Sequence, residues 1–244
     1  MSIFSSTWLD EKQKAQLGIL RDLLISIFRQ ENKETVFKGG TALSFFYGSD
    51  RFSEDLDFSV QSENTYLSID NAIEDLEKRA NYEILNDWEG EIERSGMFRR
   101  YLLRFRYGLY DTINIHIDCS MEKTLLDPDI NELANDYYVA KIKVMKREEI
   151  LAEKVRAIYT RHKGRDLYDL YILAVILKSK ISVGLIHEKF KSYKIEERYS
   201  FASFERKVEE LRRYWADLKS LVGNFESLDS EKIKEEVLDV FRNA

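Results

Sequence analysis

The sequence predicts an α/β (α+β) first half, with a mixed sheet and flanking helices, followed by an all-helical second half. Three patterns predict it. Apolar residues recur at three- and four-residue steps near the N-terminus, β-branched and aromatic residues alternate with polar ones between about 82 and 120, and helical periodicity runs from 147 onward. We therefore expect two domains, residues 1–146 and residues 147–244, with the helical domain packed against the first.

The first half is expected to mix helices and strands. Residues 10–30 place Leu17, Leu20 and Leu24 on one face of an amphipathic helix, and two more helices are expected at about 41–47 and 68–80. The strands are recognised by apolar alternation and by β-branched or aromatic residues. The expected strands are 35–37, 55–60, 99–108, 112–120 and 138–145.

The second half is expected to contain only helices. They are predicted at 147–162, 166–178, 183–193, 201–218 and 229–242. With one proline and ten glycines in 244 residues, no proline- or glycine-rich linker marks the boundary near residue 146.

Composition bounds the class of protein. Hydrophobic residues at 44% and aromatic residues at 13% support a packed core, and the net charge of −6 gives no support to non-specific binding of duplex DNA. The single cysteine, Cys119, excludes an intrachain disulfide and is expected to pack inward. No signal peptide and no apolar run long enough to span a bilayer is recognised, so we expect a cytoplasmic protein.

Two acids at alternate positions suggest a metal site. Asp55 and Asp57 fall on a predicted strand, so both point to one face while Leu56 and Phe58 anchor the other. Two neighbouring carboxylates repel each other unless a cation neutralises them, and such hard oxygen ligands suit Mg²⁺ or Mn²⁺. A solvated strand end with two surface acids is the alternative reading.

A glycine pair upstream suggests a phosphate site. Gly39 and Gly40, followed by Thr41, lie where a strand leads into a helix, and backbone amides there can hold phosphate. Arg51 and Ser53 precede the acids and are candidates for phosphate contact. The alternatives are an ordinary turn for the glycines and a turn role for Ser53.

A second group of charges lies in the helical half. Lys154 and Arg161 are seven residues apart and share one helix face, while Asp166 and Asp169 share a face of the next helix. A short connection makes the two helices antiparallel neighbours, so these faces can meet. The alternative is an ion-pair cluster that only fixes the helix pair.

A third carboxylate is a weaker candidate. Asp118 ends a predicted strand, with His116 on the same face, although an aspartate at a strand end is more often a turn residue. The neighbouring predicted strand alternates aromatic residues with Arg99, Arg100, Arg104 and Arg106, which is typical either of a solvated outer face or of one edge of an RNA path.

Two segments carry a family resemblance. KGGTALSFFYG followed by RFSEDLDF, and later KVRAIYTRHKGRDLYDLY, resemble the AbiEii/AbiGii toxin family of nucleotidyltransferases, bacterial proteins of abortive-infection and type IV toxin–antitoxin systems. The resemblance implies a nucleotidyltransferase-like fold and a helical half that closes over a triphosphate. In the first segment it places Gly39, Gly40 and Thr41 at the phosphate turn, with Ser53, Asp55 and Asp57 at the acidic strand.

In the second segment the resemblance assigns Lys154 to nucleotide phosphate and Asp169 to an essential acidic position. The wider superfamily often has a third acid that acts as a metal ligand or general base, for which Asp118 is the candidate. The roles implied are catalytic for Asp55, Asp57, Asp118, Lys154 and Asp169, and metal-binding for the first three of these.

The implied activity is metal-dependent transfer of NMP from an NTP to an acceptor hydroxyl. The acceptor would be the 3′ end of a tRNA, another RNA or a protein, and the enzyme would be the toxin of a phage-defence system whose antitoxin is encoded nearby. Two alternatives remain: a non-catalytic module that binds nucleotide or a partner protein, and a small-molecule nucleotidyltransferase of the antibiotic-modifying kind. A P-loop ATPase is excluded because the sequence has no GxxxxGK[ST] segment.

Overall fold

The computed structural model describes residues 3–30, 34–62, 64–78, 83–85, 90–92, 98–109 and 111–243. The end of the helix expected at 68–80 and parts of the strand-rich stretch 82–120 lie outside the described residues. The chain forms two compact units. We call Met1–Gly48 with Phe52–Met145 the α/β unit, and Ser49–Arg51 with Lys146–Ala244 the helical unit.

The α/β unit is built on a mixed sheet, as predicted. Its seven described strands lie in the order β3-β4-β5-β2-β1-β7-β6. They are β1 (Thr35–Lys38), β2 (Leu56–Val60), β3 (Gly90–Ile92), β4 (Phe98–Tyr107), β5 (Asp111–Met121), β6 (Asp129–Ala134) and β7 (Val139–Val144). β2 runs parallel to β5 and β1 parallel to β7, while the other neighbours are antiparallel.

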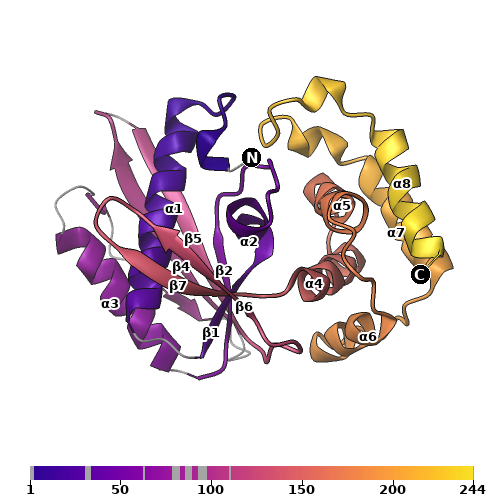
Figure 1. The fold of residues 1–244 in the computed structure, drawn as a ribbon, viewed down its shortest axis with the longest axis horizontal. Helices are drawn as coiled ribbons and strands as arrows, with labels where there is room; N and C mark the ends of the chain where they lie inside the picture. Colours follow the sequence, from indigo (N-terminus) through magenta and orange to yellow (C-terminus); the bar gives the residue numbers. More distant parts are fainter. Residues whose placement is uncertain are drawn as a thin grey trace. The chain divides into compact units, whose positions relative to one another are not determined.

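Two helices cover the apolar face of this sheet (Figure 1). α1 (Glu11–Arg29) begins with a capping box at Asp10, and its Phe28 ring lies 6.3 Å from that of Phe58 on β2. α3 (Asn64–Lys78) lies on the same face, since the Thr65 hydroxyl is 3.2 Å from that of Thr35 on β1. Because side chains alternate along each strand, the polar residues of the central strands point to the opposite face. A short helix, α2 (Gly39–Phe46), follows β1 directly.

The helical unit confirms the prediction of an all-helical second half. Its α-helices are α4 (Arg147–Thr160), α5 (Gly164–Tyr171), α6 (Val183–Ser192), α7 (Phe201–Arg212) and α8 (Ser230–Arg242). The α7 and α8 helices are joined by stacked rings of Phe204 and Phe241, whose centroids are 4.2 Å apart. Across the described residues of both units, no helix combines the length and the apolar character needed to cross a membrane.

Four details differ from the prediction. The helix expected at 166–178 changes at Ile172 into a π-helical turn, closed by the Leu177 amide donating to the Ile172 carbonyl at 2.9 Å. The helix expected at 201–218 ends at Arg212 and is followed by a separate 3₁₀ turn, Trp215–Leu218. Strand β6 was not predicted, and Asp55 lies just before β2 rather than within it.

Candidate active site

The polar face of the sheet brings two of the predicted acids into register. Asp57 on β2 is the partner of Asp118 on the parallel strand β5, and neighbouring strands lie about 4.8 Å apart. Their neighbours Phe58 and Cys119 are fully buried on the other face. The two carboxylates therefore stand side by side on the polar face, anchored by apolar residues behind them.

Asp55 reaches the same place from the loop before β2. One of its carboxylate oxygens lies 3.0 Å from Nδ1 of His116, which points to the polar face two residues before Asp118. The Thr41 hydroxyl donates to the Asp55 backbone carbonyl, so the start of α2 holds this loop in place. Thr41 thus positions Asp55, a role that the sequence did not indicate.

Arg100 is the cation bound to this group of acids. It is the cross-strand partner of Asp118, and its Nε and Nη2 each donate to a different Asp118 oxygen at 2.7 Å. These hydrogen bonds raise the pKa of Arg100 most, and the negative charges of Asp118, Asp55 and Asp57 raise it further against a partial burial that lowers it. Arg100 therefore lies within the electrostatic field of all three carboxylates.

A second ion pair lies on the same face but is buried. Lys38 is the register partner of Asp57, and its ammonium group forms an ion pair with Glu122, whose Oε1 also accepts a hydrogen bond from the Ser59 hydroxyl at 3.1 Å. The Lys38 and Glu122 side chains are only 6% and 10% exposed. A buried ion pair therefore lies beside Asp57 on the polar face.

The backbone of Gly39 and its contact with Asp57 give a reason for a glycine at this position, besides phosphate binding. Its φ of +79° is unfavourable for residues with a side chain, and a Cβ built there would lie 2.0 Å from the Asp57 Oδ2 atom. The carboxylate of Asp57 therefore packs directly against the Gly39 backbone at the start of α2. Gly40 is buried, and its carbonyl accepts a hydrogen bond from the Ser44 hydroxyl at 3.2 Å. Ser53 is buried close to the acids in sequence.

The donor chemistry of the three aspartates suits a hard divalent cation, since all their ligating atoms are carboxylate oxygens. In the described part of the chain, however, no three His, Cys, Asp or Glu side chains surround a common point as a ready metal shell. In this structure Asp118 directs both oxygens to Arg100, and Asp55 directs one to His116.

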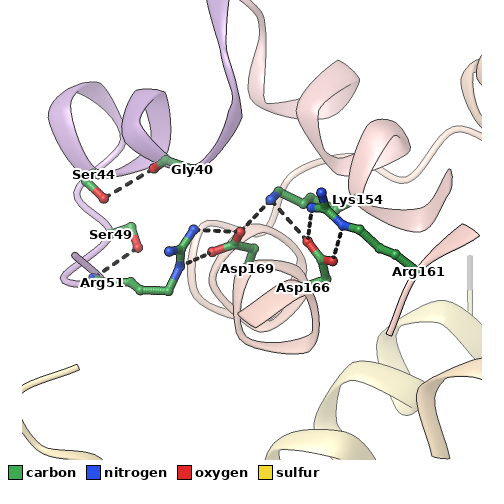
Figure 2. Close-up of polar contacts among 8 residues, drawn as sticks. All are labelled: Gly40, Ser44, Ser49, Arg51, Lys154, Arg161, Asp166 and Asp169. Carbon is green, nitrogen blue, oxygen red and sulfur yellow. Dashed lines mark hydrogen bonds and ion pairs between the residues drawn. The ribbon is translucent and has the colours of Figure 1, made fainter. Parts of the chain in front are cut away.

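The second predicted group of charges forms a cluster inside the helical unit (Figure 2). Asp169 accepts hydrogen bonds from Nε and Nη2 of Arg51 at 2.8 and 3.0 Å and pairs with the Lys154 ammonium at 2.6 Å. Asp166 accepts from Arg161 at 2.8 Å through two bonds and from Lys154 at 3.3 Å. The helix faces predicted to meet do so. Arg51, expected at phosphate, is instead bound to Asp169.

The carboxylates of this cluster are buried and are paired with cations. Three cations face two carboxylates, and both carboxylates are 0% exposed. Burial by itself would raise the pKa of Asp166 and of Asp169, but Lys154 with Arg161 outweighs it for Asp166, and Arg51 with Lys154 outweighs it for Asp169. Both pKa values are therefore held below the ordinary value.

Another buried ion cluster lies beside it on α4. The Lys189 ammonium of α6 is 2.8 Å from a Glu149 oxygen and 2.9 Å from a Glu153 oxygen, and all three side chains are almost fully buried. It joins α4 to α6 next to Lys154. Sequence reasoning missed it, although Glu149 and Glu153 share a helix face at a spacing of four.

The lowered pKa values predict how acid affects the helical unit. A carboxyl group whose pKa is lower in the folded protein stabilises the fold above its unfolded pKa of about 4, and this stabilisation is lost as the pH falls through the folded value. We expect Arg161→Gln, which removes two hydrogen bonds from Asp166, to lower the free energy of unfolding by about 1 kcal/mol at pH 7. Because the lowered pKa keeps Asp166 ionised in the folded protein, this difference should persist as the pH falls from 7 to 3.

Urea unfolding between pH 7 and pH 3 measures this difference. Arg206→Gln is the matched control, because Arg206 also pairs with a carboxylate, Glu197, but at an exposed position. Its effect should be small at every pH. A deficit of Arg161→Gln that disappears between pH 5 and pH 3 would show that the pKa of Asp166 is not held below its ordinary value.

Solved structures show which fold this chain has. Three solved structures share the fold over 96% of this chain. A putative nucleotidyltransferase from Helicobacter pylori is 22% identical in sequence, with 95% of its own chain covered and a TM-score of 0.63. JHP933 from the same organism is 23% identical, with 92% of its own chain covered and a TM-score of 0.64. MenT4, a nucleotidyltransferase toxin from Mycobacterium tuberculosis, is 17% identical, with 94% of its own chain covered and a TM-score of 0.56. At these identities the likeness establishes a nucleotidyltransferase fold.

The sequence itself assigns the family. Residues 22–239 match the model of the family described as nucleotidyl transferase AbiEii toxin, type IV TA system. The chain belongs to this family, which confirms the resemblance seen in its two motif segments. No curated protein matches the sequence.

Proposed function

We propose that this protein transfers the NMP group of an NTP to the hydroxyl of a nucleic-acid or protein acceptor, with Mg²⁺ or Mn²⁺ bound at Asp55, Asp57 and Asp118. The observation that supports this most is the placement of Asp57 and Asp118 in register, with the Asp57 carboxylate against Gly39. When bound, the metal would neutralise charge on the phosphates.

Each residue of the site has a proposed part. The backbone amides at the start of α2, at Gly39 and Gly40, bind phosphate oxygens, while Thr41 holds the Asp55 loop and Ser53 stands near it. An Asp118 oxygen accepts the proton of the acceptor hydroxyl. The hydroxyl oxygen then bonds to the α-phosphorus as the bond from that phosphorus to pyrophosphate breaks.

The helical unit supplies cations. Lys154 pairs with both carboxylates of this cluster, and we propose that it contributes its positive charge to phosphate binding. Asp169 and Arg51 then serve to hold Lys154 and the surrounding helices in place. The family also supports a physiological role as the toxin of a type IV system, with an antitoxin partner and an RNA, plausibly a tRNA 3′ end, as the acceptor.

Incubation with α-labelled NTPs, Mg²⁺ and total RNA or cell protein tests the activity. We expect label in one macromolecular fraction, release of pyrophosphate, and loss of both when EDTA removes the metal. Tight NTP binding by calorimetry without transfer would favour a non-catalytic nucleotide-binding module. Label found only on an added aminoglycoside would favour a small-molecule nucleotidyltransferase.

A further inference from the structure

Arg100 pairs with an acid of the proposed site although it is open to solvent. Its guanidinium makes two parallel hydrogen bonds to Asp118, yet its side chain is 44% exposed. The buried arginine of the helical unit, Arg51, is 2% exposed and has no comparable freedom to leave its partner. Arg100 can therefore exchange its carboxylate partner for solvent or another anion by side-chain rotation alone.

The three aspartates need a cation whether or not a metal is present. Asp57 and Asp118 are adjacent across two strands and Asp55 lies beside them, so their negative charges repel. Arg100, which is bound to Asp118 and attracted by Asp55 and Asp57 as well, offsets this repulsion.

We propose that Arg100 is an exchangeable counter-cation. It pairs with Asp118 when the metal is absent and is displaced from Asp118 when the metal binds. This inference rests on the metal site of the proposed function. It explains why the aspartates suit a hard cation in chemistry but do not form a ready shell among the described residues. Both oxygens of Asp118 are directed to the guanidinium that stands in for the metal.

The exchange has a consequence for how metal is loaded. A free metal ion must displace Arg100 and is therefore bound less tightly than three carboxylates would otherwise bind it. A metal ion that arrives with a triphosphate brings additional phosphate contacts, which help to offset the displacement. The freed guanidinium remains on the polar face, where it can pair with an anionic substrate.

Calorimetric titration with Mn²⁺ alone tests the proposal without any need for turnover. We expect Arg100→Gln to bind Mn²⁺ about tenfold more tightly than the unmodified protein, because no charge-assisted pair has to be broken. Arg100→Lys, which keeps the charge but loses the paired geometry, should lie between the two. Mn²⁺ should also raise the melting temperature of Arg100→Gln more than that of the unmodified protein.

Arg106→Gln is the matched control. Arg106 lies on the same strand and face, is 46% exposed, and makes an equivalent paired contact with Glu83, but it is six residues from Arg100. Its loss should change Mn²⁺ affinity less than twofold, about the limit of resolution, because the intervening distance of about 20 Å exceeds the screening length.

Other results would contradict the proposal. If Arg100 only clamps Asp118 in a metal-ready position, Arg100→Gln will bind Mn²⁺ more weakly. Weaker or unchanged affinity overturns the exchange and leaves the transferase proposal standing. If neither protein binds Mn²⁺, the metal site of the proposed function fails together with this inference. Circular dichroism of each variant establishes that it is folded before titration, and Arg100→Lys serves if Arg100→Gln is not.

Discussion

Replacing Asp57 with asparagine should lower the rate of nucleotidyl transfer by about a thousandfold. The amide has nearly the shape of the carboxylate, so it fits the space against Gly39 where a Cβ on residue 39 would collide. It cannot supply the negative charge that a divalent cation requires. Initial rates of label transfer from an α-labelled NTP measure the loss, and Mn²⁺ affinity should fall with it.

Asp111→Asn is the control for this variant. Asp111 is an exposed acid on β5, the strand of Asp118, and it pairs with Lys12 at 2.8 Å. The two substitutions change the net charge equally, but only Asp57 belongs to the proposed site. Equal transfer rates for Asp57→Asn and the unmodified protein would remove Asp57, and with it the proposed metal site, from the mechanism.

Replacing Asp169 with asparagine should destabilise the protein by about 3–5 kcal/mol. Asp169 is completely buried and pairs with both Arg51 and Lys154. Lys154 keeps Asp166 as a partner, but the buried guanidinium of Arg51 would face a neutral amide. Urea unfolding at pH 7 should show a midpoint shifted far below that of the unmodified protein.

A double variant separates this cause from general damage to the core. Adding Arg51→Met to Asp169→Asn removes the buried cation that has lost Asp169 and should restore part of the lost stability. Asp239→Asn, at an exposed ion pair on α8, should cost less than about 1 kcal/mol. If the double variant is as unstable as the two single losses added together, the loss of Asp169 as the partner of Arg51 is not the source of the effect.

The elements that the sequence predicted well are those with strong periodicity. α1 and the hairpin of β4 and β5 follow from apolar spacing, because burial of one face requires that spacing. β6 was missed because its sequence, DINELA, contains three polar residues and pairs at the edge of the sheet. The π-helical turn after Tyr171 was missed because an apolar run there is compatible with an uninterrupted α-helix.

The candidate site was also predicted only in part. Local patterns and the resemblance made Asp55, Asp57 and Asp118 candidates but did not indicate Arg100 as a partner of Asp118. Pairing Arg100 with Asp118 requires the register of β4 and β5, which depends on where the connecting turn falls. Pairing Arg51 with Asp169 joins residues 118 positions apart, and no local spacing reports such a contact.

The inclusion of Ser49–Arg51 in the helical unit limits how this protein can be rearranged in evolution. The chain on both sides of these three residues belongs to the α/β unit, so the helical unit is not one continuous stretch of sequence. A recombination event that exchanged residues 146–244 with those of a relative would leave Arg51 behind. The incoming helices would then need an acid at the position of Asp169 that suits the resident arginine. Exchange of the C-terminal half as a cassette is therefore restricted to relatives that share this pair.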